Sequence, residues 1–463
     1  MDLFSKEPEA LYANTGYGPR FAVLDIGLMD RVAVIEPDSA FWAIVKNEAV
    51  SEALSGSLPA DFQKQQEKFR KEMDFLRFGL KPSAAYFNPT ERCNFNCGYC
   101  YLPEEMRRNG KTMTADEICN ALDRLLAYFN GHMAGDGIRP QIIFHGSEPM
   151  LAREAVFAGI RKFKDDFFFG VQTNASLLDR EAISFLTEHS VGIGISLDAD
   201  TDVLANNIRK NWHGQGAFDQ IVKVMDELAA YPAFNVITTV TSLNVHILPD
   251  MVNFYHDHGV KMVMFNPVRC TQEGGKALKP DDEQLARSFC EALDRVYELY
   301  EKTGQKMVVT NFANILAGII GPTARRLMCD ISPCGGGRCF FAVSAHGDLF
   351  PCSEFIGFPE FKGGNLFKDE LQDALQSPPF LEMTRRKVED ISPCATCAIR
   401  HFCGAPCPAE VRALSGTFNA PAPYCRFYEE QARYAFRVLA NGREEAFLWE
   451  DWDDETEETF CWS

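Results

Sequence analysis

The stretch CNFNCGYC, residues 93–100, decides how the rest of the chain is interpreted. Its cysteines Cys93, Cys97 and Cys100 have the spacing C-x3-C-x2-C, so three thiols lie on one tight loop. A structural zinc ion usually takes four ligands, and the nearest histidine, His132, is far along the chain. A cubane iron–sulfur cluster can be held by three protein thiolates, which leaves its fourth iron open to a small molecule. We therefore expect an iron–sulfur site, with a zinc site or incidental cysteines as the alternatives.

An alternation of apolar and amphipathic segments surrounds this loop. Amphipathic stretches of helical length separate short apolar runs at 84–88, 141–145, 167–172, 191–195, 235–240 and 261–265. This alternation predicts parallel strands that are joined by helical crossovers. Six such units are two fewer than a closed eight-stranded barrel requires. The predicted fold class is therefore α/β, with an open, partial (β/α)6 barrel over residues 84–310.

Polar or turn-rich segments follow five of these runs. They are the cysteine loop, GSEP (146–149), TNAS (173–176), SLDAD (196–200) and NPV (266–268). In β/α barrels the active site is built from the loops at the C-terminal ends of the strands. The five segments are therefore expected to meet at one mouth of the barrel.

The regions on either side of the barrel have different compositions. Residues 1–80 predict a small α+β unit, with a β-hairpin within 20–37 and helical spacing over 38–54 and 61–80. Residues 311–435 are predicted to be a cysteine-rich domain, to whose folding bound metal clusters contribute energy. The domain is expected to end in a helix over 431–440. The acidic residues 436–463 are expected to form a solvated, partly disordered tail, with a contact for a basic partner as the alternative.

Composition excludes several classes of function. A net charge of −19 argues against a nucleic-acid-binding protein, which needs a basic surface. No apolar run approaches the roughly 20 residues of a membrane span, and the first residues lack the features of a signal peptide. A cytoplasmic location is therefore expected. Disulfides are rare in that compartment, so the clustering among the 16 cysteines points to metal binding.

A C-x3-C-x2-C motif directly after the first strand of a β/α barrel resembles the radical S-adenosylmethionine (radical SAM) superfamily. The resemblance implies a [4Fe–4S] cluster on Cys93, Cys97 and Cys100, whose open iron is chelated by S-adenosylmethionine. Reduction of that cluster would give a 5′-deoxyadenosyl radical, which abstracts hydrogen from a substrate. Tyr99, the aromatic residue before the last cysteine, would pack near the adenine.

The other loops extend the resemblance to the cofactor. GSEP is similar to the family's GGEP motif, which contacts the amino group of the cofactor, although Ser147 replaces a glycine. TNA is similar to TNG, while Ser196 and Asp198 match positions that bind the ribose, and the segment after the sixth strand matches the adenine site. The implied cofactor-binding residues are Tyr99, Gly146, Ser147, Glu148, Pro149, Thr173, Asn174, Ser196, Asp198, Phe265 and Asn266.

The later cysteines resemble the SPASM domain of peptide- and protein-modifying radical SAM enzymes. Twelve residues separate Cys334 from Gly347, and four separate Gly347 from Cys352. A C-x2-C-x5-C-x3-C run and one further cysteine complete the pattern, at Cys394, Cys397, Cys403, Cys407 and Cys425. Cys339 adds an eighth thiol, as in anaerobic sulfatase-maturating enzymes.

That resemblance implies two auxiliary [4Fe–4S] clusters, hence three clusters in all. Cys334, Cys339, Cys352 and Cys407 would hold one of them. Cys394, Cys397, Cys403 and Cys425 would hold the other. Cys329, five residues before Cys334, is an alternative ligand.

The substrate is less well defined than the chemistry. In sulfatase maturases an Asp directly follows the cysteine that corresponds to Cys352, whereas here Ser353 stands in that place and Glu354 follows. Sulfatase maturation is therefore in doubt, and Glu354 becomes a candidate catalytic base, with Asp348 and the acids near the barrel mouth as the alternatives. The N-terminal unit resembles the domains with which peptide maturases capture a leader segment by strand addition; a purely structural cap is the alternative.

Length and layout resemble the maturases of quinohemoprotein amine dehydrogenase. That similarity implies thioether cross-links between Cys sulfur and carbon of Asp, Glu or another residue, in a peptide or a small cysteine-rich subunit. A flavodoxin or ferredoxin would supply electrons. Carbon–carbon cross-linking, epimerisation and sulfatase-type oxidation are the alternatives within the class. A non-catalytic iron–sulfur electron carrier is the alternative from another class.

Overall fold

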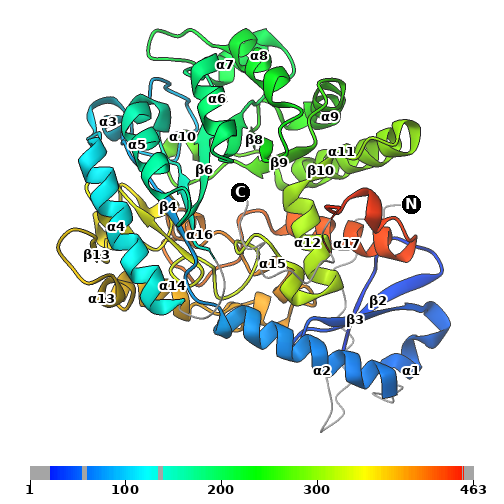
Figure 1. Ribbon diagram of the computed structural model, residues 1–463. Helices are drawn as coiled ribbons and strands as arrows, with labels where there is room; N and C mark the ends of the chain where they lie inside the picture. The colour runs from blue at the N-terminus through cyan, green and yellow to red at the C-terminus, as the bar shows by residue number, and fades with distance from the viewer. Residues whose placement is uncertain (1–20, 55–59, 134–138, 451, 453–463) are drawn as a thin grey trace.

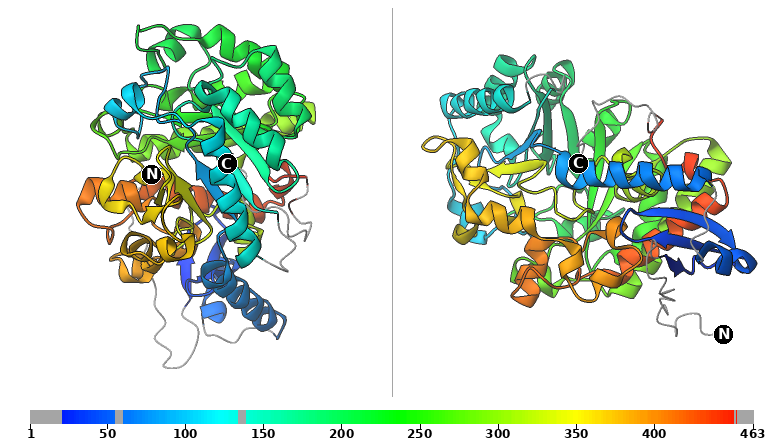
Figure 2. Two further views of the ribbon diagram at one scale, coloured as in Figure 1. Left: turned by 60° about the vertical axis from the view of Figure 1, so that its left-hand side comes forward. Right: turned by 90° about the horizontal axis from the view of Figure 1, so that it is seen from below.

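A computed structural model describes residues 21–54, 60–133, 139–450 and 452 (Figure 1). The first twenty residues of the predicted N-terminal unit, and residues 451 and 453–463 of the predicted acidic tail, lie outside this part. The chain has a large sheet with helices around it, a small N-terminal sheet, and an irregular C-terminal region beside both (Figures 1 and 2).

Ten strands of the described chain form the large sheet, in the order β10-β9-β8-β7-β6-β5-β4-β11-β12-β13. Neighbours from β10 to β11 pair in parallel, and β12 and β13 are antiparallel. The parallel strands β4 to β9 are the six predicted from the sequence, so the α/β prediction is confirmed. The bounds are β4 Ala84–Phe87, β5 Gln141–Phe144, β6 Phe168–Thr173, β7 Gly192–Ser196, β8 Phe234–Val240, β9 Met262–Pro267, β10 Val308–Val309, β11 Phe340–Val343, β12 Asp348–Phe350 and β13 Gly364–Asn365.

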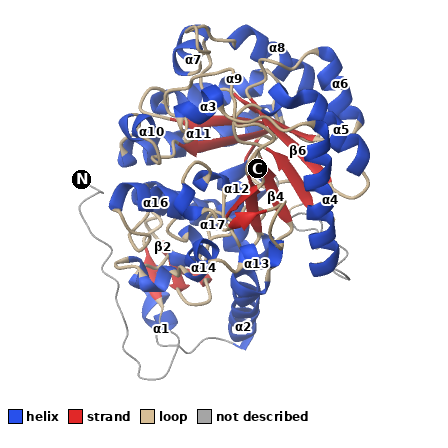
Figure 3. Ribbon diagram, turned by 90° about the vertical axis from the view of Figure 1, so that its left-hand side faces the viewer, coloured by secondary structure: helices blue, strands red, loops and turns tan. Residues whose placement is uncertain are grey.

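Helices connect the parallel strands and lie outside the sheet (Figure 3). Their ends follow local capping rules: Thr114 and Glu117 form a reciprocal capping box at the start of α4, and Asp179 caps α6. The bounds are α3 Glu104–Asn109, α4 Ala115–His132, α5 Arg153–Phe163, α6 Arg180–Glu188, α7 Asp202–Ile208, α8 Phe218–Leu228, α9 Leu248–Asp257, α10 Glu273–Ala277, α11 Asp282–Thr303 and α12 Thr310–Ile320.

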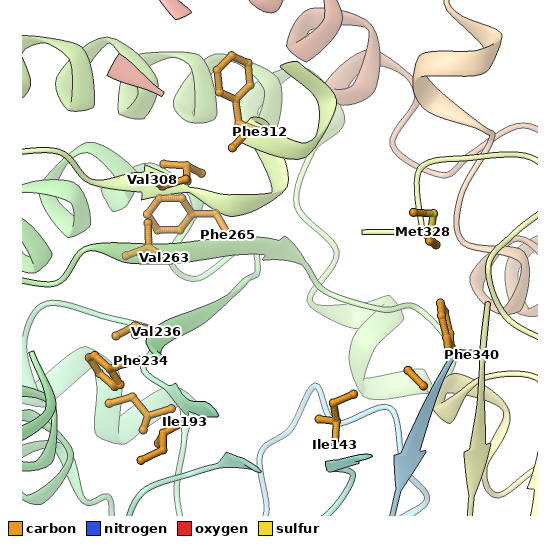
Figure 4. Packing of buried hydrophobic residues seen from close by; sticks show 14 of the residues in the cluster. Ile143, Ile193, Phe234, Val236, Val263, Phe265, Val308, Phe312, Met328 and Phe340 are labelled. Atoms are coloured by element: carbon orange, nitrogen blue, oxygen red, sulfur yellow. The ribbon is translucent and has the colours of Figure 1, made fainter. Parts of the chain in front are cut away.

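Apolar side chains of the strands and crossover helices form one continuous core. Figure 4 shows part of it, where Phe265 and Val263 of β9 pack near Val308 and Phe312, and Met328 faces Phe340 of β11. All of these side chains are buried. Burial of this extent fixes the strand ends, and therefore the loops that follow them.

The C-terminal region joins the large sheet directly, which the sequence did not predict. Strand β11 pairs in parallel with β4, in the register Phe340↔Ala84, so β4 lies inside the sheet and not at its edge. The cysteine loop after β4 therefore lies between the barrel and the C-terminal region. That region also contains α13 Leu371–Leu375, α14 Pro378–Arg385, α15 Arg400–Cys403, α16 Pro408–Ser415 and α17 Cys425–Ala440.

The N-terminal unit differs in part from its prediction. The hairpin is present as β1 (Ala22–Leu24) and β2 (Arg31–Glu36), and the second helix is α2 (Ala60–Asp74) with a π-helical turn over Phe75–Gly79. The helix predicted within 38–54 is wrong, because Phe41–Lys46 forms strand β3 and only Val50–Leu54 forms a helix, α1. Aromatic and β-branched side chains favour the strand, and pairing with β2 outweighs the helical spacing.

The prediction of a solvated tail over 436–463 is wrong for residues 436–448. Helix α17 continues to Ala440, and Ala446, Phe447 and Leu448 are buried in the main core. These apolar side chains hold residues 441–448 against the molecule despite the acidic residues near them in sequence.

Candidate functional site

The loop that carries the three cysteines lies between β4 and α3 and is held by the segment after α7. The indole nitrogen of Trp212 donates a hydrogen bond to the Cys93 carbonyl at 2.8 Å. The backbone of Asn96 donates to the carbonyl of Lys210 at 2.7 Å. The Arg108 guanidinium lies 4.1 Å from the centre of the Trp212 ring. These contacts hold the loop against the segment after α7.

Cys97 of this loop is buried and Cys93 and Cys100 are half-buried, and two arginines nearby favour the charged form of the Cys97 and Cys100 thiols. Burial raises the pKa of Cys97 and of Cys100, while nearby guanidinium groups lower both values. Arg209 and Arg107 act on Cys97, and Arg107 acts most strongly on Cys100. Cations next to buried sulfur are what a thiolate-bound cluster requires for charge balance.

The sulfur atoms of some cysteines accept a hydrogen bond from the backbone N–H of the residue two positions later in the chain. The N–H of Phe95 donates to Cys93 at 3.4 Å, and that of Gly336 donates to Cys334 at 3.4 Å. Such hydrogen bonds stabilise metal-bound thiolates and lower the pKa of the sulfur. The same backbone N–H, two positions later in the chain, lowers the pKa of the Cys100, Cys352, Cys397 and Cys403 thiols.

Glu148 of the GSEP segment joins two of the predicted cofactor loops. Its buried carboxylate accepts hydrogen bonds from the Thr173 hydroxyl at 2.7 Å and from the backbone of Asn174 at 2.8 Å. Ser147, which stands where the family has glycine, donates to the Glu91 carbonyl at 2.6 Å and so ties this segment to the cysteine loop.

Gly146 precedes this pair with φ +103°, and a Cβ there would lie 2.2 Å from the Asn88 side chain. Both the backbone angle and the close approach require glycine. Ser147, which replaces a glycine of the family motif, does not have a positive φ, so the position in this segment that requires glycine is Gly146.

Asp198 is fully engaged by protein groups. Its carboxylate accepts hydrogen bonds from the Tyr99 hydroxyl at 2.5 Å and from the backbone of Thr239 at 2.8 Å, and it pairs with Arg209 at 3.3 Å. The Arg209 guanidinium also contacts the Tyr99 hydroxyl. Asp198 does not line the cavity itself and instead holds Tyr99 and Arg209, which do, in position.

These loops enclose a cavity of about 340 Å³ that extends from the cysteine loop into the C-terminal region. The predicted residues on its wall are Cys93, Cys97, Tyr99, Cys100, Gly146, Ser147, Thr173, Asn174, Ser196, Asn266, Cys334, Cys352, Glu354 and Cys407. The predicted residues that do not line it are Glu148, Pro149, Asp198, Phe265, Cys339, Cys394, Cys397, Cys403 and Cys425. The mouth predicted at the strand ends is therefore a cavity, and it extends to Cys334, Cys352 and Cys407.

The cysteines of the C-terminal region fall into two groups. Cys334, Cys352 and Cys407 influence one another's pKa values, as do Cys394, Cys397, Cys403 and Cys425. The buried Arg386 lies between the groups, donating hydrogen bonds to the carbonyls of Ala405 at 2.9 Å and Phe418 at 2.7 Å. Burial lowers the pKa of Arg386, and cysteines of both groups act in the opposite direction and raise it.

Between the cysteine loop and the C-terminal region, the cavity wall carries groups that can transfer protons or bind anions. Burial raises the pKa of Glu354 to about 7, opposed by Arg269, and one carboxylate oxygen of Glu354 is buried without a hydrogen-bond partner in the described chain. Burial lowers the pKa of His145 to about 4, so that imidazole is neutral, and its ring stacks on Tyr101.

Sequence reasoning missed several residues of this site. Arg209 follows α7, Trp212 comes three residues later, and Arg269 directly follows the NPV segment after β9. Of these three residues, only Arg269 could have been found from the sequence, because it follows the C-terminal end of a predicted strand. Tyr101 lies next to Cys100 in sequence and packs with Cys100 and Cys352 around a second apolar cluster.

The donor set fits clusters of several irons. Within the described ranges, no three His, Cys, Asp or Glu side chains are close enough to hold a single metal ion. Cys93, Cys97 and Cys100 all line the cavity, and each iron of a cubane takes its own thiolate. The described helices are each too short or too polar to cross a bilayer.

Comparisons with known proteins agree with this geometry. A model of the radical SAM superfamily matches residues 87–255, and a model of the SPASM iron–sulfur cluster-binding domain matches residues 334–398. An uncharacterized protein of Archaeoglobus fulgidus is 38% identical, over 88% of this chain and 92% of its own length. A cysteine-type anaerobic sulfatase-maturating enzyme of Clostridium perfringens is 23% identical, over 75% of this chain and 95% of its own.

A solved structure, native anSMEcpe with bound AdoMet and Cp18Cys peptide, has a TM-score of 0.66 at 19% identity. The match covers 79% of this chain and 99% of that one. The cysteine loop, the strand-end loops and the later cysteine groups are thus those of a known family, whose members bind iron–sulfur clusters and S-adenosylmethionine. The chain belongs to the radical SAM superfamily and carries a SPASM domain.

Proposed function

We propose that this protein modifies a peptide or small protein after translation, joining a cysteine sulfur to a carbon as a thioether. The observation that carries the proposal is the single cavity of about 340 Å³, whose wall holds both the three-cysteine loop and the thiols of Cys334, Cys352 and Cys407. A substrate side chain in this cavity is within reach of both sites. The likeness to a fold solved with a bound peptide supports a peptide substrate.

Three [4Fe–4S] clusters are part of the proposal. Cys93, Cys97 and Cys100 would hold the first, and the two later cysteine groups would hold the auxiliary ones. When bound, a reduced first cluster and S-adenosylmethionine would supply a 5′-deoxyadenosyl radical that takes one substrate hydrogen atom, and an oxidised cluster would take up the electron released when the carbon–sulfur bond closes. Forming C–S from C–H and S–H then leaves one proton for the protein.

We assign that proton to Glu354. The side chain lines the cavity, follows Cys352 by two residues and has one unpartnered oxygen. Arg269 lies near it and balances its charge. Glu354 therefore meets the geometric requirement for a general base, which is access to the reacting atoms.

The cofactor would occupy the end of the cavity near the cysteine loop. Gly146, Ser147, Thr173, Asn174 and Ser196 line that end, with Asn266 of β9 on the opposite wall. Tyr99 presents its ring there and is fixed by Asp198. In the proposal Asp198 and Glu148 hold neighbouring side chains in position, while the residues on the cavity wall contact the cofactor.

The N-terminal unit is proposed to bind part of the substrate. Strand β3 is an edge strand of the sheet β1-β2-β3, and an extended peptide can add to such an edge. Residues 1–80, 84–310 and 311–435 would then serve substrate capture, radical generation and auxiliary electron transfer. A flavodoxin or ferredoxin would reduce the clusters.

The test is the mass of the product. The anaerobically reconstituted protein is incubated with S-adenosylmethionine, a reductant and candidate small cysteine-containing proteins encoded beside its gene. A thioether removes two hydrogens from the substrate and also removes a free thiol, so the product should lose the mass of two hydrogens and resist alkylation at one cysteine.

Two variants serve as controls. Cys93→Ala should give no product, and Glu354→Gln should slow product formation by about 10²-fold or more if it is the base. A product that loses two hydrogens and keeps every alkylatable thiol would contradict the thioether and indicate a carbon–carbon link.

A further inference from the structure

One arginine on the cavity wall is only weakly engaged by other groups of the protein. Among the described residues that line the cavity, the long cationic side chains are those of Arg107, Arg209 and Arg269. Arg107 donates a hydrogen bond to the Asn96 side chain at 2.9 Å. Arg209 contacts the Asp198 carboxylate and the Tyr99 hydroxyl. The first two arginines are therefore held by the protein itself, and the third is the one to account for.

Arg269 has a single polar partner within the described chain. That partner is Glu410, whose carboxylate lies 3.5 Å from the guanidinium, and the Arg269 side chain remains 21% exposed. The other carboxylate oxygen of Glu410 accepts a hydrogen bond from the backbone N–H of Cys270 at 3.0 Å. A guanidinium carries five N–H donors in a rigid fork. One long contact leaves most of these donors available to a ligand in the cavity.

The groups around Arg269 place its charge at the cavity wall. Burial lowers the pKa of Arg269, but four neighbours hold it above its ordinary value, namely Cys407, Glu410, Tyr428 and Glu354. All of these except Glu410 line the cavity. No ion pair joins Arg269 to Glu354 in the described chain, and one Glu354 oxygen has no hydrogen-bond partner there. A substrate group between these two side chains would contact both of them.

The rest of this part of the wall is unfavourable to an anion. Much of it is apolar, with Ile315, Leu327, Met328, Met383 and Phe427 among the lining residues. The acidic side chains of the wall, Asp330 and Glu354, would repel a second carboxylate. A carboxylate leaves water at low cost only when it is paired. A guanidinium with unused donors is such a partner, because its fork matches the two carboxylate oxygens.

We propose that Arg269 binds a carboxylate of the substrate, that of an Asp or Glu side chain, and so selects the residue that gives up its hydrogen. The inference rests on the proposed function, whose cavity and substrate it shares. Asn266, three residues earlier at the end of β9, lies at the cofactor end of the cavity, and Glu354 lies beside Arg269. A carboxylate on Arg269 would therefore hold its neighbouring methylene between the cofactor and the assigned base.

The binding experiment uses two probes of the same shape, N-acetyl-L-aspartate amide and N-acetyl-L-asparagine amide. Ligand-observed nuclear magnetic resonance measures their binding to the full-length, anaerobically reconstituted protein with saturating S-adenosylmethionine. Wild type should prefer the aspartate probe, and Arg269→Gln should weaken binding of that probe by about tenfold or more without changing that of the asparagine probe. N-acetylglycine carries only a terminal carboxylate, so tighter binding of N-acetylglycine would overturn the choice of an acidic side chain.

Glu410→Gln is the matched control, because it distinguishes ligand binding from a purely structural role of Arg269. The variant keeps an oxygen acceptor for the Cys270 N–H and removes the charge with which Arg269 pairs. It should bind the aspartate probe at least as tightly as wild type, since the guanidinium is then freer. Equal weakening of the probe in Glu410→Gln and Arg269→Gln, with equal loss of melting temperature, would overturn the proposal. So would a wild-type protein that does not distinguish the two probes.

The source of the abstracted hydrogen gives a second readout. Candidate substrate proteins are made with deuterium on the side-chain methylenes of Asp and Glu, and 5′-deoxyadenosine is analysed by mass spectrometry. Deuterium should appear in 5′-deoxyadenosine, and deuterium-free 5′-deoxyadenosine formed together with modified product would overturn the proposal. A product that keeps every alkylatable thiol would refute the thioether of the proposed function, while the deuterium and the probes would still decide the role of Arg269.

Discussion

Single residues outside the recognised motifs fix the cysteine loop, and Trp212 is the clearest case. Its indole N–H satisfies the Cys93 carbonyl, and its ring packs under Arg108. The cysteines themselves could be predicted because metal ligation imposes a short, fixed spacing. Trp212 and Arg209 could not, because their positions depend on how the chain returns after α7.

Trp212→Phe should loosen the first cluster. The substitution keeps an aromatic ring and leaves the Cys93 carbonyl without its donor, which costs about 1–3 kcal/mol. We expect faster loss of about a third of the iron to a mild chelator. Trp449→Phe is the control, because Trp449 also packs against an arginine and lies far along the chain from the loop. Equal rates of iron loss in the two variants would contradict this role.

Ala175 stands where the family has glycine, and its backbone explains the family's choice. Its φ is +60°, a left-handed conformation that costs an alanine about 1 kcal/mol or more. Ala175→Gly should therefore leave the melting temperature unchanged or raise it. Ala182→Gly, at an equally buried position inside α6, should lower it, since glycine inside a helix costs about 1 kcal/mol. A comparable drop in both variants would show that the backbone of Ala175 carries no strain.

At the scale of elements, periodicity predicted the parallel strands well because each is buried and is followed by an amphipathic helix. It failed at β3, where aromatic and β-branched residues also fit helical spacing, and at β11 to β13, which are short and pair with a strand far away in sequence. Strand pairing over long sequence distances leaves little local pattern.

Helix α10 is an element whose position the cysteine loop depends on. A Cβ at Gly274 of α10 would lie 1.9 Å from the carbonyl oxygen of Gly98, in the middle of CNFNCGYC. Gly274→Ala should displace the loop and reduce the iron content by about four per chain after reconstitution. Gly98→Ala places its Cβ where nothing lies within 4 Å and should keep wild-type iron. Full iron content in Gly274→Ala would show that the loop yields without harm.

At the scale of the whole molecule, the barrel and the C-terminal region are joined across the cavity. Buried Glu410 of α16 accepts a hydrogen bond from the Cys270 backbone at 3.0 Å and pairs with Arg269 at 3.5 Å. The sequence predicted both regions but not this contact, because the relative placement of two regions depends on surfaces that periodicity does not describe. The shared cavity, and with it the position of Glu354, follows from that placement.

Glu410→Ala should destabilise the protein strongly. Removing one partner of a buried pair leaves the other uncompensated and costs about 3–5 kcal/mol. The change would appear as a lower denaturant midpoint and faster proteolysis between the two regions. Asp123→Ala, which removes an exposed pair with Lys162, should cost less than about 1 kcal/mol. Similar stability of the two variants would mean that the contact through Glu410 does not hold the regions together.

The central claim is that the open three-cysteine site generates a radical from S-adenosylmethionine. The most direct measurement is 5′-deoxyadenosine formation by the anaerobically reconstituted protein with dithionite and S-adenosylmethionine. Wild type should form 5′-deoxyadenosine, and Cys93→Ala should form none above background, because the first cluster would lack a ligand. No 5′-deoxyadenosine from wild type with its iron in place, or an unchanged yield from Cys93→Ala, would contradict the claim.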